Sequence, residues 1–474
     1  MHKLERVFNP RSVAVVGGKR INNYNWLRNV IDFDGPKYHV NIDETEWPGA
    51  AELGFPNYKS ITDIPGEVDF VIIAVPAAVV PRVMADCAAK GVQGVHVFTA
   101  GFGETGTEKG KELEDAMVEH ANKANIRLVG PNCLGIFNPK LNIGYSGAGY
   151  SGEAGNIACI SQSGSQANGV ISEALEYGFK MSKLVSMGNG IVVDSAEYLE
   201  YFAQDDDTEV ISLFLEGVRN GERFFSVLRE VCKSKPVLVC KVGETEDAAR
   251  ATSAHSATER IPRHLWDSML RQCGAVRIDN VQELIDSTKA VLARNLLDGP
   301  RLGLICQGGG HATEMANVFS KEGFRIPALT ERSYEKLLES FDIIGGSYRN
   351  PIEGGSLRTE EGMIGVLDIL DGDENLDGIV QELPVSRLLR GRDDDMALKN
   401  RLNTLCEFGT RAKKPYAIVI DPTYPQVDPA LTKAVYDQLR DANIPAIYGF
   451  ARTAKALWGA MEYQQRRARS LATG

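Results

Sequence analysis

One pattern recurs along the whole chain and strongly limits the folds that it can adopt. A short run of β-branched residues leads into a glycine-rich turn, and an amphipathic stretch follows. This alternation predicts βα units in parallel sheets. In the first third, strands are expected at residues 12–18, 68–76, 94–101 and 126–132, with helices at 80–90 and 108–124. The predicted class is therefore α/β.

Two later segments share a layout that indicates an internal repeat. Residues 156–179 and residues 301–324 each contain an apolar strand, a glutamine, a glycine-bearing turn and an amphipathic helix that ends in Gly-Phe. The following segments also match, because EVISLFLEGV and KPVLVCKVG resemble LDGIVQELPV and KPYAIVID. Two copies of one doubly wound module are the simplest explanation. We expect a first domain at 1–145 and the two copies at 150–295 and 298–465.

Size and charge restrict the class of protein. A chain of 474 residues predicts two to four domains, and a net charge of -11 argues against binding to nucleic acid. The N-terminus has no apolar signal core, and no stretch approaches the ~20 apolar residues that span a bilayer. The eight cysteines are dispersed without a CxxC pair, which is typical of a reducing cytoplasm. We expect a cytoplasmic protein without a membrane segment.

The ends of the first predicted strands could bind an anionic ligand. Gly17-Gly18 follows the first strand, with Lys19 and Arg20 next. Val75-Pro76 and Thr99-Ala100-Gly101 end later strands and should face the same crevice, because ligands bind at the carboxyl edge of parallel sheets. The turn lacks GxGxxG, and no acidic residue closes the second strand, so a nicotinamide cofactor is disfavoured. A purely structural turn remains an alternative.

A serine-rich turn between a strand and a helix is a second candidate anion site. Ser163, Gly164 and Ser165 combine hydroxyls with the N–H groups of a helix start, an arrangement that suits phosphate. The alternative is a plain helix cap. The matching turn of the second copy, residues 308–311, could bind an anion or preserve only the shape.

Two side chains in the first copy could act on a phosphoryl group. His255 lies between serines in a segment of small residues after a strand, and its ring nitrogen is nucleophilic near neutral pH. Glu216 ends a strand of the same module, and a carboxylate against one ring nitrogen fixes the tautomer. An exposed loop histidine and a capping carboxylate are the alternatives. Asn132-Cys133 ends another strand, and Cys133 could be a nucleophile. This role is disfavoured, because no histidine that could activate the thiol lies near Cys133 in sequence.

Metal binding by this chain is not expected. No cluster of His, Cys, Asp or Glu has the spacing of a zinc site or an EF-hand. Any magnesium would accompany a nucleotide.

A series of ordered motifs resembles a known family. They are VFNPRSVAVVGG, VDFVIIAVPA, GVHVFTAGFGE, GPNCLGIFNP, SQSGSQA, VSMGNGIVVDSAEYLEYFAQD, LFLEGV, ARATSAHSA and QCGAVRIDNVQELID. Together they resemble the α-subunit of the ADP-forming acetyl-CoA (acyl-CoA) synthetases, within the succinyl-CoA synthetase superfamily, over essentially the whole chain. The resemblance implies a CoA-binding Rossmann domain followed by two flavodoxin-like ligase domains.

The resemblance also implies roles for individual residues. His255 would be phosphorylated, Glu216 would support it, and Ser163, Gly164 and Ser165 would seat the phosphate. The CoA crevice would include residues at the first sheet's edge. They are Gly17, Gly18, Lys19, Val75, Pro76, Thr99, Ala100, Gly101 and Asn132.

The implied activity interconverts acid, CoA and ATP with acyl-CoA, ADP and phosphate through an acyl phosphate and a phosphohistidine. The chain has no room for an ATP-grasp domain, so a separate ATP-grasp β-subunit should hold ATP or ADP with Mg²⁺, giving a hetero-oligomer. The first loop, GGKRINNYNW, departs from the family pattern, which favours a small organic acid bulkier or more polar than acetate. Two alternatives are a regulatory or scaffold protein that binds CoA or acyl-CoA, and a relative that transfers acyl or carbamoyl groups.

Overall fold

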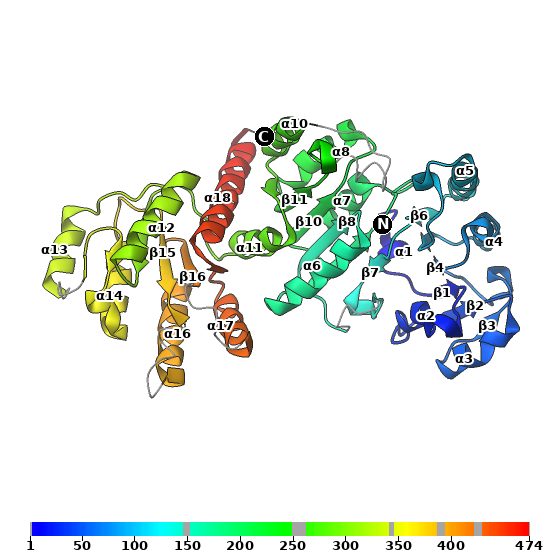
Figure 1. Ribbon diagram of the computed structural model, residues 1–474, viewed down its shortest axis with the longest axis horizontal. Coiled ribbons are helices and arrows are strands. Elements are labelled where there is room, and N and C mark those ends of the chain that lie inside the picture. Colours follow the sequence, from blue (N-terminus) through cyan, green and yellow to red (C-terminus); the bar gives the residue numbers. More distant parts are fainter. Residues whose placement is uncertain are drawn as a thin grey trace. The chain divides into compact units, whose positions relative to one another are not determined.

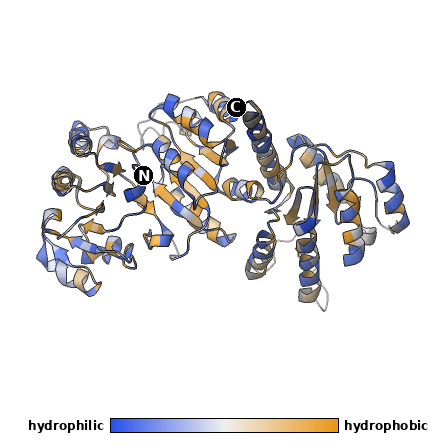
Figure 2. Cartoon of the chain, turned by 180° about the vertical axis from the view of Figure 1, so that it is seen from behind, coloured by the Kyte–Doolittle hydropathy of each residue, from blue (hydrophilic) through white to orange (hydrophobic). Residues whose placement is uncertain are grey.

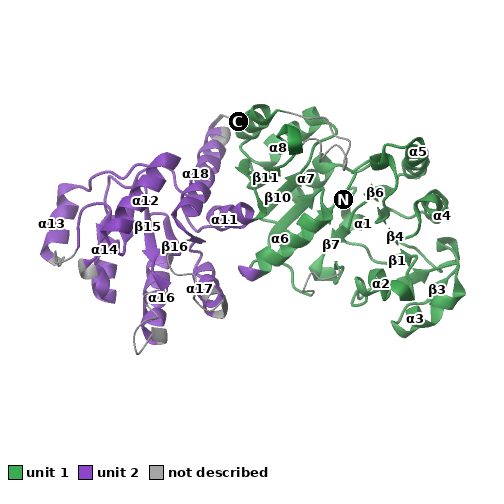
Figure 3. Ribbon diagram, viewed as in Figure 1, with its two compact units in different colours: residues 1–175, 179–281 green, residues 176–178, 282–474 purple. Residues whose placement is uncertain are grey.

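The computed structural model describes residues 2–145, 152–248, 262–340, 346–385, 394–420 and 429–473. The described strands form three β-sheets, flanked by helices (Figure 1). The chain divides into two compact units, residues 1–175 with 179–281, and residues 176–178 with 282–474 (Figure 3). The first unit contains two sheets and the second unit contains one.

The first sheet has the strand order β3-β2-β1-β4-β5-β6, and its neighbouring strands all pair in parallel. This order is that of a dinucleotide-binding Rossmann fold. Four of its strands lie where the sequence predicts them, whereas β2 and β3 were not predicted. The strands are β1 Val13–Val16, β2 Lys37–Val40, β3 Asn57–Tyr58, β4 Phe70–Ile73, β5 Gly94–Val97 and β6 Arg127–Val129.

The second and third sheets share one strand order, which confirms the predicted repeat. Their orders are β12-β11-β10-β8-β9-β7 and β14-β13-β15-β16-β17, so each contains the flavodoxin-like order 2-1-3-4-5. The strands of the second sheet are β7 Gly135–Phe137, β8 Ile157–Ser161, β9 Met181–Ser186, β10 Val210–Leu215, β11 Val237–Lys241 and β12 Val276–Ile278. Those of the third are β13 Leu302–Cys306, β14 Ile352–Glu353, β15 Gly378–Leu383, β16 Tyr416–Ile420 and β17 Ala446–Tyr448.

Helices connect the strands and present apolar faces to the sheets. In Figure 2 the strands of the second sheet are largely orange, whereas the helices carry both colours. In the first unit the helices are α1 Glu5–Phe8, α2 Asn25–Arg28, α3 Trp47–Glu52, α4 Val80–Lys90, α5 Glu108–Lys123, α6 Gly164–Glu176, α7 Ser195–Gln204, α8 Gly221–Val231 and α10 Arg263–Cys273. The others are α11 Val281–Val291, α12 Gly309–Glu322, α13 Glu331–Ser340, α14 Glu360–Asp371, α16 Asp394–Arg411, α17 Pro429–Asp441 and α18 Phe450–Thr473.

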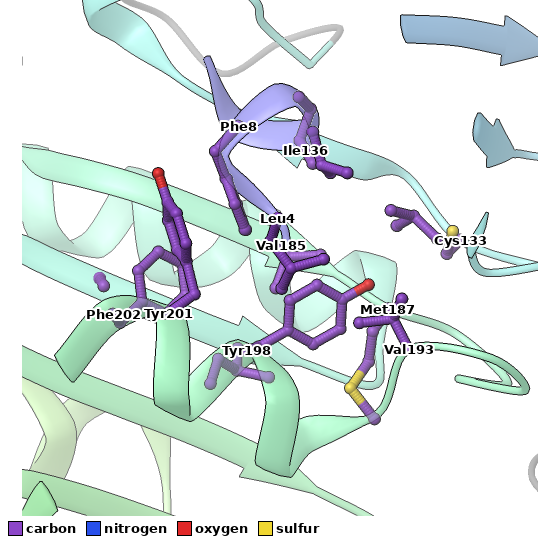
Figure 4. Close-up of a cluster of buried hydrophobic side chains, with 14 of the residues drawn as sticks. Leu4, Phe8, Cys133, Ile136, Val185, Met187, Val193, Tyr198, Tyr201 and Phe202 are labelled. Atoms are coloured by element: carbon purple, nitrogen blue, oxygen red, sulfur yellow. The ribbon is translucent and has the colours of Figure 1, made fainter. Parts of the chain in front are cut away.

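The two sheets of the first unit share one hydrophobic core. Strand β7 comes from the first 145 residues but pairs antiparallel with β9 of the second sheet. Phe8 of α1 stacks on Tyr201 of α7 with ring centroids 4.6 Å apart and also packs against Phe202 (Figure 4). Each buried aromatic ring contributes about 2 kcal/mol or more of transfer free energy. The shared core crosses the proposed boundary between residues 145 and 150, so that boundary stays a prediction. The proposed boundary near residue 295 also stays a prediction.

A buried histidine lies where the strands of the first sheet approach this shared core. His96 on β5 is 1% exposed, and its Nε2 lies 3.1 Å from the carbonyl oxygen of Cys133. Gly135 packs so closely that a Cβ there would lie 2.4 Å from the ring. Burial lowers the pKa of His96 to about 4. The imidazole is therefore neutral at physiological pH.

This histidine should make the first unit less stable in mild acid. The unfolded chain binds a proton at His96 near pH 6.5, whereas the folded protein does so only near pH 4. The unfolded state thus holds more protons between these values, and stability falls as the pH drops from 6.5 toward 4, by up to about 3 kcal/mol. Urea unfolding at pH 7.5 and pH 5 should show a smaller pH dependence in His96→Gln than in the wild type. Equal pH dependence in both proteins would contradict this assignment.

Candidate active site

The turn after β1 lies at the point where the strand order of the first sheet reverses. Strand β1 has β2 on one side and β4 on the other, with Val16 opposite Ile73. Gly17 follows β1 with φ +99°, and a Cβ there would lie 2.5 Å from the carbonyl oxygen of Ala74 and 2.7 Å from Val75. Only glycine fits such a close approach of two chains. The structure therefore brings Gly17 and Val75 together, as predicted from the strand ends.

A carboxylate that the sequence analysis missed fixes the rest of this turn. Glu46 Oε2 accepts hydrogen bonds from the Arg20 N–H at 2.7 Å and from the Tyr24 hydroxyl at 3.0 Å. The Gly18 carbonyl accepts from Asn41 at 2.9 Å. Lys19 and Arg20 remain exposed. The turn thus offers two cations at its rim, while the Arg20 amide is already bound within the protein.

Three of the remaining predicted residues of the first sheet, Val75, Thr99 and Asn132, lie in one hydrogen-bonded chain. The Thr99 hydroxyl donates to the Val75 carbonyl at 2.6 Å, and the Asn132 N–H donates to the Thr99 carbonyl at 3.0 Å. Asn132 has φ +58°, a left-handed conformation that asparagine tolerates. The ends of β4, β5 and β6 are therefore tied together, and they position these residues at the same edge as Gly17.

Glu104, also missed by the sequence analysis, links this edge to the second sheet. Its Oε1 accepts from the N–H groups of Gly101 at 2.6 Å and Phe102 at 3.2 Å, and its Oε2 accepts from Asn189 at 2.7 Å. Burial raises the pKa of Glu104, but these hydrogen bonds outweigh burial and hold the pKa below its ordinary value. Asn189 follows β9, so the carboxyl edges of both sheets meet here. Glu104 belongs to the GFGE motif, but its partner Asn189 lies 85 residues away in the chain. The motif alone therefore did not indicate this link.

The serine turn lies at the corresponding reversal point of the second sheet, between β8 and β10. The Ser163 hydroxyl accepts from the Gln166 N–H at 3.4 Å and lies 3.1 Å from the Ser165 hydroxyl. A Cβ on Gly164 would lie 3.0 Å from Leu134, so the start of α6 is close against the 130–134 segment. The turn therefore has the capping geometry of the structural alternative. It also has the hydroxyls and helix start that a phosphate seat needs.

Gln162 joins this turn to Glu216, and sequence reasoning did not assign it a role. Its Oε1 accepts from the backbone N–H groups of Glu216 and, at 3.0 Å, of Gly217. Glu216 is half-buried directly after β10. The serine turn and the predicted carboxylate are thus held on adjacent strands by one amide side chain. The glutamine that recurs in both copies was the signal available in the sequence.

The second copy differs at the equivalent place. Glu382 on β15 is fully buried, accepts from the Gln307 N–H at 2.9 Å and lies 2.6 Å from His311 Nδ1. In the first copy, Phe214 occupies the strand position that matches Glu382. There the Gln162 N–H donates to the backbone carbonyl of Phe214, and not to a carboxylate. A buried carboxylate at the start of α12 disfavours a second anion at that helix. The predicted phosphate seat is therefore better developed in the first copy.

His255 lies outside the described residues. Strand β11 ends at Lys241 before this segment, and α10 begins at Arg263 after it. Lys241 is 6% exposed, and burial lowers its pKa.

Among the described residues, no group of three or more His, Cys, Asp or Glu side chains could hold a metal ion. No helix in the described part of the chain is long and apolar enough to cross a membrane.

Comparisons with known proteins identify the family. Residues 11–139 match the model of a CoA binding domain, and residues 154–291 match the succinyl-CoA ligase like flavodoxin domain. The α-subunit of Pyrococcus furiosus acetate–CoA ligase [ADP-forming] II is 33% identical over 382 residues, which cover 80% of this chain and 81% of the relative. The chain belongs to the family of ADP-forming acyl-CoA synthetase α-subunits. The resemblance and the fold class predicted from the sequence are both confirmed.

Two further relatives of the synthetase α-subunit cover the chain to different extents. Acetate–CoA ligase [ADP-forming] I of Archaeoglobus fulgidus is 35% identical over 379 residues, 79% of this chain but 54% of the relative. The chain thus spans about half the length of that protein. The solved "dinucleotide forming Acetyl-coenzyme A synthetase 1" of Ca. Korarchaeum cryptofilum, in complex with phosphate and ADP, is 25% identical. Its TM-score is 0.83, and the match covers 100% of this chain and 99% of that chain.

Proposed function

We propose that this α-subunit interconverts a small organic acid, CoA and ATP with acyl-CoA, ADP and phosphate, together with an ATP-grasp β-subunit. The observation that carries the proposal is the placement of Glu216 by Gln162 beside the serine turn at the start of α6. A helix start favours the negative charge of a phosphoryl group, and a carboxylate favours an imidazolium beside it. The name of the Pyrococcus furiosus relative, a subunit α, supports a partner subunit.

The first sheet fits CoA. Its reversal point brings Gly17, Val75 and Thr99 together, and Lys19 at the rim supplies a cation for phosphate groups. Gly18, Pro76, Ala100, Gly101 and Asn132 complete the proposed crevice. The Gly101 amide already donates to Glu104, so it would shape the crevice and not bind the ligand. CoA would supply the thiol that accepts the acyl group.

The chemistry follows from three displacements. In the direction of acyl-CoA breakdown, a phosphate oxygen attacks the thioester carbonyl, the C–S bond breaks and the thiol leaves with a proton. His255 then attacks phosphorus, the acid leaves as its carboxylate, and the phosphoryl group passes to the diphosphate. Ser163 and Ser165 would orient the phosphoryl oxygens, and Glu216 would support positive charge on the ring. Mg²⁺ would accompany the nucleotide on the partner.

A stoichiometric assay of the assembled enzyme tests the proposal. The chain and its ATP-grasp partner are incubated with ATP, CoA and a panel of carboxylic acids, including acetate and bulkier or more polar acids. We expect equal amounts of acyl-CoA, ADP and phosphate. In the reverse direction, CoA release from acyl-CoA should require phosphate. AMP with pyrophosphate, phosphate-independent CoA release, or CoA binding without turnover would each contradict the proposal.

A further inference from the structure

Arg219 bridges two loops at the carboxyl edge of the second sheet. It lies in the loop between β10 and α8, and its Nε and Nη2 donate hydrogen bonds to the backbone carbonyl of Asn189 at 3.2 and 3.0 Å. Asn189 lies in the loop that follows β9. Because β8 lies between β10 and β9 in the sheet, this bridge crosses the end of β8. The serine turn follows β8, so a cation is fixed at the edge where the proposed phosphate seat lies.

The carbonyl that the guanidinium binds is itself firmly held. The Asn189 N–H donates to the Pro131 carbonyl at 3.1 Å, and the Asn189 side chain donates to Glu104 at 2.7 Å. Asn189 is 9% exposed, and Ile191 in the same loop packs against the core of the first sheet. The guanidinium thus rests on a well-packed part of the first unit, where the carboxyl edges of its two sheets meet. This support fixes the direction of the planar fork.

Most of the N–H groups of Arg219 are not used by this bridge. A guanidinium has five N–H donors, and two of them bind the Asn189 carbonyl. Arg219 is exposed, and among the described residues it forms no ion pair. In contrast, Arg223 on the following helix pairs with Glu200 at 3.0 Å. A cation that is anchored by a carbonyl but not neutralised by a carboxylate is suited to bind an oxyanion.

We propose that Arg219 binds the phosphate that attacks the thioester, and so completes the seat at the start of α6. The proposal rests on the proposed function, in which the serine turn holds that phosphate. Hydroxyls and helix N–H groups favour an anion but carry no full charge. Phosphate carries more than one negative charge near neutral pH, and Glu216 beside the turn adds another. A fixed cation at the same edge offsets this repulsion, and Arg219 supplies it.

The test measures CoA release from acyl-CoA by the assembled enzyme over a range of phosphate concentrations. Arg219→Gln should raise KM for phosphate about tenfold or more, because the anion loses a charge-assisted contact, while KM for acyl-CoA stays within about twofold of the wild type. Arg219→Lys keeps the charge but loses the fork, so its KM for phosphate should be intermediate. Arg223→Gln is the matched control, because it removes the same charge from the exposed pair with Glu200, and it should behave as the wild type.

The outcomes separate this inference from the proposed function. An unchanged KM for phosphate in Arg219→Gln, when the wild type requires phosphate, would overturn the inference alone. Equal rises in KM for phosphate and for acyl-CoA would also overturn it, because Arg219 would then only tie its loop to Asn189.

Two further measurements close the remaining possibilities. In the direction of acyl-CoA synthesis, a raised KM for the acid with an unchanged KM for phosphate would assign Arg219 to the carboxylate and overturn the inference. Should Arg219→Gln fail to fold, Arg219→Lys decides, and a wild-type KM for phosphate in that variant would overturn it. CoA release by the wild type without phosphate would instead overturn the proposed function.

Discussion

Replacing His255 with asparagine should abolish acid-labile phosphate on this chain. When the assembled enzyme is incubated with labelled ATP, the wild type should carry label that acid removes and base does not, as expected of a phosphohistidine. Asparagine keeps a polar side chain of similar size but has no nucleophilic ring nitrogen. We expect no label and a loss of turnover of at least a thousandfold, because the proposed route has no other carrier.

His264→Asn is the matched control for this experiment. His264 lies nine residues further along the chain and is exposed on α10, outside the residues of the proposed site. It should retain labelling and turnover at the wild-type level. Labelling that persists in His255→Asn and disappears in His264→Asn would move the carrier to α10 and contradict the proposed mechanism.

Gly17→Ala should damage both the stability of the first unit and its affinity for CoA. The backbone of Gly17 has φ +99°, which costs an alanine about 1 kcal/mol or more, and the new Cβ would lie 2.5 Å from a backbone oxygen of Ala74. Because neither chain can yield without moving β1 or β4, we expect about 3 kcal/mol of destabilisation in total. Calorimetric titration with CoA should show affinity lowered at least tenfold.

Gly66→Ala separates the backbone cost from the close approach. Gly66 also has a positive φ, +77°, but a Cβ there would meet nothing within 4 Å. It should lose only about 1 kcal/mol and bind CoA as the wild type does. Equal destabilisation by the two substitutions would show that the contact with Ala74 is unimportant, and the Gly17 turn would then have no special role.

Strand periodicity predicted the first sheet in part. The strands β1, β4, β5 and β6 are apolar runs bounded by glycine or proline, and all four were found. In contrast, β2 reads Lys37-Tyr38-His39-Val40, with a polar first half and two half-buried residues, and β3 has only two residues. Neither segment is an apolar run, and pairing of β2 with β1 and of β3 with β2 is what makes them strands. The repeat was predictable because both copies keep the same strand and turn signals.

The candidate site was predictable wherever a residue directly follows a strand. Gly17 and Glu216 directly follow β1 and β10, and Thr99 lies two residues after β5, so all three could be placed at the edge where parallel strands end. Residues that act through distant partners could not be placed. Glu46, Glu104 and Gln162 each bind groups 22 to 85 residues away in the chain. A hydrogen bond of that kind depends on tertiary packing, which local pattern does not encode.

The antiparallel strand β7 has a mechanical consequence for chemistry between the two sheets of the first unit. A strand that leaves one domain to complete its neighbour's sheet removes the hinge that a linker would otherwise provide. The turn at Gly17 and the start of α6 are then parts of one solid frame. Their separation is fixed when the chain folds, so ligands at these two proposed sites would lose no binding energy in aligning two lobes.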